Sequence, residues 1–242
     1  MRIAPNPARP PGRKSCLSDR RGTGGGGYVL PEDPEGPVEM LDIVDSDLNI
    51  VGTADREQVH QEGFWHQTFH CWLFRREEGA IRLLFQLRHP HRIANPDRLD
   101  VTAAGHIVHG EEPRDGVREL EEELGLRVDP DELISLGVWA EEMDLNQGWI
   151  DREYRHVHLY ECRHPLSTFH LQPEEVSGLF EADLEEVRHL LTGEQKTVDL
   201  SGWVLREDGS RQEETRRVTS QDFVPHSPGY YRMVFDALRR YE

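Results

Sequence analysis

The chain has 242 residues, 36% of them apolar, which is enough for one full domain with extensions or for two small domains. Its 46 acidic residues outnumber its 28 lysines and arginines, and the net charge of −18 makes it a poor general binder of nucleic-acid backbone. No run approaches the roughly 18 apolar residues of a membrane span, so we expect no membrane partner. The three cysteines have no paired spacing, which argues against a disulfide scaffold and favours a reducing, cytoplasmic location.

The chain is predicted to divide into a tail, a main domain and an extension. Residues 1–37 are predicted to be a disordered tail, because 14 of these 37 residues are proline or glycine. Met40 is an alternative start of the protein. Residues 38–192 are predicted to form the main domain, and residues 193–242 a hairpin and a helix that pack on it.

Apolar alternation and turn residues predict many short strands and few helices. In chain order, the predicted strands are at residues 41–44, 49–54, 68–74, 81–87, 99–103, 133–141, 154–162, 174–180 and 198–205, with a last strand ending near Val218. The predicted helices are at residues 55–60, 118–124, 183–191 and 230–241. This order of strands and helices favours an α+β fold in which helices pack on a sheet.

The strongest chemical signal is the helix that begins at residue 118, with the sequence RELEEEL. At about 100° per residue, Glu119, Glu122 and Glu123 fall within an arc of about 100°. Leu120 and Leu124 fall on a different arc, which can pack on a core. Like charges at this spacing repel each other, and a divalent cation that prefers oxygen ligands offsets that cost. A solvated acidic helix face is the alternative interpretation.

The wider stretch from Gly105 to Leu126, GHIVHGEEPRDGVRELEEELGL, resembles the Nudix box, written G-x5-E-x7-R-E-U-x-E-E-x-G-U with U an aliphatic residue. One departure is that six residues instead of seven separate Glu111 from Arg118. The resemblance implies a Nudix-like α/β/α sandwich with a mixed central sheet. We expect Gly105, Arg118 and Gly125 to support the site structurally, Arg118 by pairing with a helix glutamate and Gly125 by ending the helix.

The resemblance extends to the isopentenyl-diphosphate-isomerase-like branch of the same superfamily, over about residues 40–191. The matching segments are residues 65–66, 69–74, 85–88, 99–106 and 172–177. In the isomerases of that branch a metal is held by histidines and acids. The matching positions here are His66, His106, Asp151 and Glu153, with His60 displaced by one residue.

The isomerases of that branch carry a protonating cysteine at the position before Gly105, where this chain has Ala104. An alanine cannot donate a proton. The isomerases also have a degraded acidic helix, whereas this chain keeps all three glutamates of the motif. Both observations favour hydrolysis of a diphosphate over isomerisation.

The predicted chemistry is the metal-assisted attack of water on a diphosphate linkage, with Mg2+ or Mn2+ as the cofactor. The predicted metal ligands are Glu119, Glu122 and Glu123, with Glu111 as a conditional fourth. The predicted catalytic residues are Glu119, Glu122 and Glu153, of which Glu119 and Glu153 are candidates for the general base. His66 and His106 are candidates for a second metal subsite. Arg88 is a candidate substrate contact, with a surface salt bridge as its alternative role.

We therefore predict a metal-dependent Nudix hydrolase that cleaves a nucleoside diphosphate linked to another moiety. Its expected partner is a small-molecule diphosphate substrate, without nucleic acid or membrane, and a homodimer is left open. The alternatives are an isopentenyl-diphosphate isomerase and a non-catalytic Nudix-fold binding module. Residues 88–98, 144–151 and 193–226, which would select the leaving group, carry no motif that names it.

Overall fold

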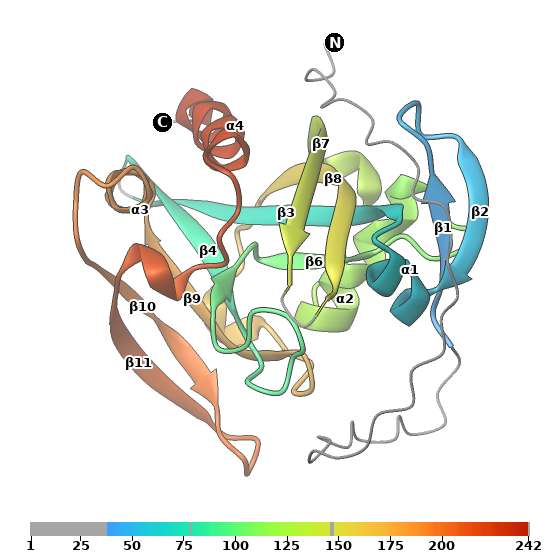
Figure 1. Ribbon diagram of the computed structural model, residues 1–242. Helices are drawn as coiled ribbons and strands as arrows, with labels where there is room; N and C mark the ends of the chain where they lie inside the picture. Colours follow the sequence, from blue (N-terminus) through green and yellow to red (C-terminus); the bar gives the residue numbers. More distant parts are fainter. Residues whose placement is uncertain (1–37, 78, 146–147, 242) are drawn as a thin grey trace, which may run out of the picture.

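The structure of the protein is a computed structural model, which describes residues 38–77, 79–145 and 148–241. The predicted tail, residues 1–37, lies outside the described residues. A long, twisted sheet runs through the molecule, with helices packed against it (Figure 1). In the described part of the chain, no helix is both long enough and apolar enough to cross a membrane.

Nine strands form one mixed sheet, as predicted. Its main path has the strand order β11-β10-β9-β4-β3-β8-β7, while β5 pairs with β4 and β6 pairs with β3. The strands are β3 (Trp65–Glu77), β4 (Ala80–Arg88), β5 (Leu99–Asp100), β6 (Ala103–His106), β7 (Ile134–Asp144), β8 (Ile150–Glu161), β9 (Val176–Asp183), β10 (Val198–Leu205) and β11 (Arg211–Val218). β3 and β8 run parallel, and the neighbouring pairs β3–β4 and β7–β8 are antiparallel.

Helices cover both faces of the sheet, which confirms the α/β/α sandwich. The α-helices are α1 (Arg56–Glu62), α2 (Arg118–Leu124), α3 (Leu184–Leu191) and α4 (Pro228–Leu238). Successive side chains of β3 point to opposite faces. Leu73 joins a buried cluster with Leu120 of α2, whereas Trp72 joins a second cluster with Val234 of α4. Figure 1 shows α3 and α4 next to each other, and both helices contribute to the buried cluster that contains Trp72.

The predicted strand at residues 99–103 is in fact two short strands, β5 and β6, that pair with different neighbours. The change of partner occurs at Thr102, whose hydroxyl donates to the Leu84 carbonyl at 2.6 Å and accepts from the Leu73 amide at 2.9 Å. The Thr102 side chain thus bridges β4 and β3 in place of backbone hydrogen bonds between these strands. As a result, β6 carries the chain across to β3 and delivers Gly105 to the site.

The remaining elements follow the predicted order with shifted ends. A separate two-stranded sheet, β1 (Met40–Val44) and β2 (Ile50–Asp55), precedes α1. Asp183 caps α3 by accepting from two backbone amides, as predicted. β8 begins at Ile150, earlier than the strand predicted at residues 154–162, so Asp151 and Glu153 lie on a regular strand. The short 3-10 helices are η1 (Pro113–Val117), η2 (Pro130–Glu132), η3 (Leu166–Thr168), η4 (Ser220–Asp222) and η5 (Arg239–Tyr241).

Candidate active site

Helix α2 forms where the motif predicts it and has two chemically different faces. Leu120 and Leu124 are fully buried in the core. Gly125 follows the helix with a left-handed φ of 68°, a conformation that suits glycine. Glu119 and Glu123 are buried on the side that faces β6, whereas Glu122 is exposed. The helix therefore presents the predicted acidic face, with two of its three carboxylates removed from water.

Between Glu111 and Arg118, where the motif is one residue short, the chain forms the 3-10 helix η1, which leads directly into α2. Glu111 still contacts Arg118, whose Nε donates to Glu111 Oε1 at 2.7 Å. Its other oxygen accepts from the Val108 amide at 3.0 Å.

Arg118 lies among the predicted acidic ligands. Nη1 donates to Glu119 at 2.6 Å and to Glu122 at 2.9 Å, and Nη2 donates to the carbonyl of His106 at 2.9 Å. The hydrogen bond to Glu111 and the charges of the neighbouring carboxylates raise the pKa of Arg118 above its ordinary value, against the opposing effect of burial. Arg118 therefore links the carboxylates to β6 as one connected group.

Gly105 and Ala104 bring β6 into direct contact with the acidic helix. A Cβ atom at Gly105 would lie only 2.0 Å from Glu119 Oε1, so no larger residue fits there without moving that carboxylate. The backbone amide of Ala104 donates to Glu123 Oε2 at 3.1 Å, and the Gln86 side chain donates to the same oxygen at 3.3 Å. The lack of a side chain at residue 105 thus sets the position of the buried carboxylates.

Burial makes the charged form of this cluster costly. Burial raises the pKa of Glu119 to about 7, with Arg118 opposing the shift and the charge of Glu122 adding to it. Burial, followed by the charge of Glu119, raises the pKa of Glu123 well above its usual range. A divalent cation would relieve this cost, and a set of ligands made only of oxygen suits Mg2+ or Mn2+.

Three histidines converge on the opposite side of β6. His60 of α1, His66 of β3 and His106 of β6 have ring centroids 5.1 to 5.5 Å apart. In each ring, Nδ1 contacts an oxygen acceptor. These acceptors are the carbonyls of Arg56 and Phe64 and the carboxylate of Glu39. In a neutral ring these contacts place the hydrogen on Nδ1 and leave a lone pair on Nε2, as in a histidine that ligates a metal.

Asp151 and Glu153 of β8 face the same histidines. Asp151 Oδ1 lies 3.6 Å from Nε2 of His60 and 3.7 Å from Nε2 of His66. Both Asp151 Oδ1 and His66 Nε2 are buried without a hydrogen-bond partner. The ligand atoms of His66, Asp151 and Glu153 lie within 4.8 Å of one another, and so do those of His60, His66 and His106. Buried, unpartnered atoms that face one point fit a cation held by imidazole and carboxylate.

The electrostatics of this second group also suit a cation. Burial lowers the pKa of His66 to about 3 and also lowers that of His60, so both rings are neutral near pH 7. Burial and then the charge of Glu153 raise the pKa of Asp151. Burial likewise acts to raise the pKa of Glu153, but the charge of Arg155 and those of the neighbouring histidines together outweigh it and hold that pKa below its usual range.

Two residues near the histidines were not predicted from the sequence. Glu39 accepts from His106 Nδ1 at 2.8 Å. Burial acts to raise the pKa of Glu39, but this hydrogen bond and the charges of His106, Arg56 and Arg118 together lower it to about 2. Trp149 stacks on His60 with ring centroids 5.7 Å apart. Glu39 precedes His106 by 67 positions, so no local spacing could indicate the contact.

The guanidinium of Arg88 forms hydrogen bonds within the protein. Its Nη1 donates to Asp100 at 2.9 Å, and its Nε and Nη2 donate to the carbonyl of Ala94. Substrate binding by Arg88 stays a prediction, and it would require these bonds to be exchanged. Arg92, which the sequence analysis did not single out, pairs with Glu175 at 2.8 Å, and its charge acts on the acidic cluster.

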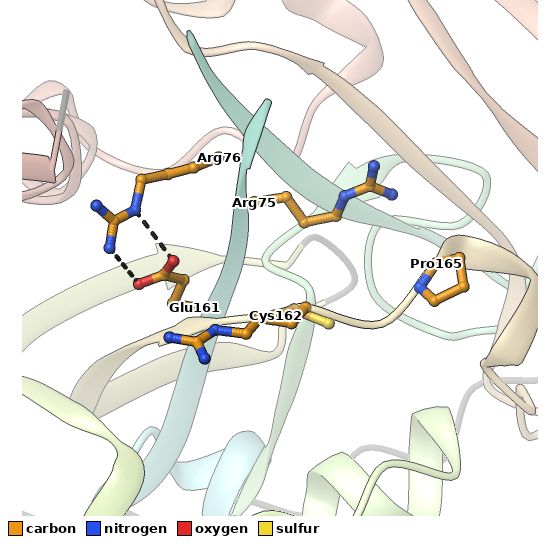
Figure 2. Close-up of a pocket in the computed structure, with 6 residues that line it drawn as sticks. Arg75, Arg76, Glu161, Cys162 and Pro165 are labelled. Atoms are coloured by element: carbon orange, nitrogen blue, oxygen red, sulfur yellow. Dashed lines mark hydrogen bonds and ion pairs between the residues drawn. The ribbon is translucent and has the colours of Figure 1, made fainter. Parts of the chain in front are cut away.

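A pocket of about 300 Å³ lies at the other end of the β3–β8 pair (Figure 2). Its lining residues are Arg75, Arg76, Glu161, Cys162, Arg163 and Pro165. At about 3.3 Å per strand residue, Arg75 is roughly 30 Å from His66 along β3. Figure 2 shows Arg76 turned toward Glu161, with which it pairs, while Arg75 extends in another direction. We assign this pocket no part in the site.

Comparisons with known proteins identify the family of the chain. A NUDIX domain model matches residues 65–202. An uncharacterized Nudix hydrolase of Clostridium acetobutylicum is 40% identical over 200 residues, which cover 83% of this chain and 97% of the relative. Nudix hydrolase 3 of Arabidopsis thaliana is 37% identical over 161 residues, which cover 64% of this chain but 21% of that larger protein. An isopentenyl-diphosphate Delta-isomerase of Aliivibrio fischeri is 27% identical over 153 residues, covering 61% of this chain and 83% of the isomerase. The family model and the 40% identical relative together show that this chain belongs to the Nudix hydrolase family.

Proposed function

We propose that the protein is a divalent-metal-dependent hydrolase that splits the diphosphate linkage of a nucleoside diphosphate bound to another moiety. One observation carries the proposal. Glu119 and Glu123 are buried against β6, while Arg118 holds Glu122 beside them. Such a cluster is unfavourable by itself and becomes favourable with a hard cation and the phosphate oxygens that the cation attracts.

In this mechanism Glu119, Glu122 and Glu123 would hold Mg2+ or Mn2+. A bound ion of this kind neutralises the diphosphate oxygens and makes a water molecule more acidic. Glu119, which is buried beside the other proposed ligands, is the first candidate for the general base. Glu153 is the second candidate. Glu111 is engaged by Arg118 and Val108, so we propose that it orients Arg118 and acts as a ligand only conditionally.

We further propose that the histidines form a second metal subsite together with Asp151 and Glu153. The ligand set would be His60, His66, His106, Asp151 and Glu153. Imidazole ligands favour Mn2+ or Zn2+ over Mg2+ at this position. The two subsites flank β6, because successive side chains of a strand point to opposite faces: Gly105 adjoins the acidic helix and His106 the histidines. A diphosphate bound across this strand end would contact both.

A hydrolysis screen with a matched pair of variants tests the proposal. The panel contains nucleotide sugars, dinucleotides, nucleoside di- and triphosphates, coenzyme A and thiamine diphosphate, each with Mg2+ and with Mn2+. Glu122→Gln should abolish metal-dependent turnover. Glu121→Gln is the control, because Glu121 lies on the same helix with a similar exposure, 49% against 52% for the Glu122 side chain, and pairs with Arg127 outside the cluster. Equal activities of the two variants, or no metal-dependent hydrolysis of any compound, would refute the proposal.

The two alternative functions are open to direct assays. Ala104 supplies no proton donor, so incubation with isopentenyl diphosphate should yield no isomer, and a measurable yield would reverse this assignment. A binding module without catalysis would bind a nucleotide in calorimetry without hydrolysing it. We also propose a cytoplasmic location, because Cys71 and Cys162 are free thiols. Homodimer formation stays a prediction that light scattering tests.

A further inference from the structure

A buried arginine, Arg155, forms a hydrogen bond with Glu153. Arg155, two positions further along β8, is 1% exposed, and its Nε donates to Glu153 Oε2 at 2.6 Å. Its Nη1 donates to Oε2 of Glu141, on the neighbouring strand β7, at 3.2 Å. Desolvation of a guanidinium costs several kcal/mol unless carboxylates and hydrogen bonds compensate it. Glu153 therefore contacts this arginine while it lies within reach of the ligand atoms of His66 and Asp151.

His226, from the segment that precedes α4, completes the surroundings of this arginine. Its Nδ1 lies 2.9 Å from Arg155 Nη1, and its Nε2 lies 2.7 Å from Asp100 Oδ1. An arginine has no acceptor, so Nδ1 must accept the hydrogen from Nη1. Nε2 then carries the ring hydrogen and donates it to Asp100. The two contacts thus select one neutral tautomer of His226 and hold its ring between β8 and β5.

The same C-terminal segment also holds the second carboxylate bound to the arginine. The Ser227 amide donates to Glu141 Oε1 at 2.8 Å, and the Ser227 hydroxyl donates to Oε2 at 3.1 Å. The ring of Tyr230 packs next to the guanidinium, with its centroid 5.5 Å from Arg155 Cζ. Residues 226–230 therefore surround Arg155 with an acceptor, an anchored carboxylate and an aromatic ring.

We propose that His226 is a positioning residue for Glu153, acting through Arg155, and that the C-terminal extension is thereby part of the histidine–carboxylate metal subsite. The inference rests on that subsite of the proposed function. The guanidinium is a rigid planar fork, so its Nε and Nη1 hydrogen bonds move together. When the acceptor at Nη1 is lost, the fork can rotate toward Glu141, and Nε turns away from Glu153. The carboxylate then loses its fixed direction toward the subsite.

Two substitutions separate this role from simple packing in the core. His226→Asn places an amide oxygen near the position of Nδ1, which keeps an acceptor for Arg155 but gives up the contact with Asp100. His226→Gln places its amide near the position of Nε2, which keeps the contact with Asp100 but gives up Arg155. Tyr231→Phe is the control for loss of stability, because it removes a buried hydrogen bond to the Val224 carbonyl in the same segment.

The experiment titrates the metal-free full-length protein with Co2+, whose visible absorption reports binding by imidazole, and with Mg2+ in calorimetry. Loss of a residue that orients a ligand typically weakens metal binding about 10- to 100-fold, and we expect that loss of Co2+ affinity in His226→Gln. His226→Asn and Tyr231→Phe should stay within about threefold of the wild type on the same scale, and Mg2+ affinity should be unchanged. Equal weakening in the Asn and Gln variants, or none in the Gln variant, overturns the role of His226.

Two further results are independent of whether the variants fold. If the wild-type protein shows no histidine-bound Co2+, the metal subsite of the proposed function fails, and this inference fails with it. If Co2+ binds but 15N NMR of the wild-type imidazole shows His226 with its hydrogen on Nδ1, or with both nitrogens protonated, only the positioning role is overturned. The expected spectrum is that of the neutral ring with its hydrogen on Nε2.

Discussion

Gly105→Ala tests the close approach of β6 to the acidic helix. The added Cβ would lie 2.0 Å from Glu119 Oε1, while ordinary contacts begin at 3.4 Å, so the carboxylate must move by about 1.4 Å. A displacement of about 1 Å in a catalytic group can cost about 100-fold in rate, equivalent to about 2.7 kcal/mol in the transition state. We therefore expect kcat/KM for the best substrate of the screen to fall by about 100-fold or more, with a parallel loss of Mg2+ affinity.

The fold should survive this substitution. Gly105 has no left-handed φ, so alanine can adopt its backbone conformation, and the Glu119 side chain can rotate away. We expect the free energy of unfolding, measured in urea, to change by less than about 1 kcal/mol. Gly52→Ala is the matched control, because a Cβ there would meet its nearest atom at 3.6 Å, an ordinary contact. Wild-type turnover and Mg2+ affinity in Gly105→Ala would refute the proposal that activity depends on the position of the Glu119 carboxylate.

Four more predictions rest on the contacts, burial and pKa shifts of single residues. His66→Asn should remove Co2+ or Zn2+ binding at the histidines but leave Mg2+ binding by α2 intact, as measured by calorimetry with each ion. Loss of Mg2+ binding as well would mean that the histidines and α2 form one inseparable site. Because the pKa values of Glu119 and Glu123 are both raised, to about 7 for Glu119, Mg2+ must displace protons from its ligands. Its affinity, measured by calorimetry, should therefore fall by at least about tenfold for each pH unit below 7, and a flat profile would contradict this. The raised pKa of Glu119 also means that the folded, metal-free protein holds the proton of this carboxyl more tightly than the unfolded chain, so its stability should decline as pH rises from about 4.5 to 7. Leu120→Ala should lower the free energy of unfolding, measured in urea, by about 2 to 5 kcal/mol, because Leu120 is fully buried. A smaller decrease would show that the surrounding core closes the cavity left by the leucine side chain.

Features that depend on neighbouring residues could be predicted from the sequence. The acidic and apolar faces of α2 follow from i, i+3 and i+4 spacing, and Gly125 and Asp183 mark helix ends through local backbone chemistry. The β10–β11 hairpin was predicted from its turn residues for the same reason. The family resemblance rests on such local spacing too. It covered the acidic helix, even though the loop before it was one residue short.

Strand ends and partners were less predictable, because they depend on residues distant in the sequence. The single strand predicted at residues 99–103 is divided between β4 and β3 by the hydroxyl of Thr102. The 3-10 conformation of η1, which lies in the part of the motif that is one residue short, has no signature in the spacing itself. Nothing in the sequence placed Glu39 beside His106 or His226 beside Arg155, since these pairs are 67 and 71 positions apart.

By itself the sequence determined the family and the acidic face of α2, because both depend on residue types at fixed spacings along the chain. The tertiary structure alone decided how the histidines meet the acids. His66 lies opposite Glu153 in the parallel register of β3 and β8, and His106 lies opposite Thr68 in the pairing of β6 with β3. A shift of one residue in either register would turn those side chains to the other face of the sheet. The second subsite is therefore a product of strand pairing, which no short stretch of the chain specifies.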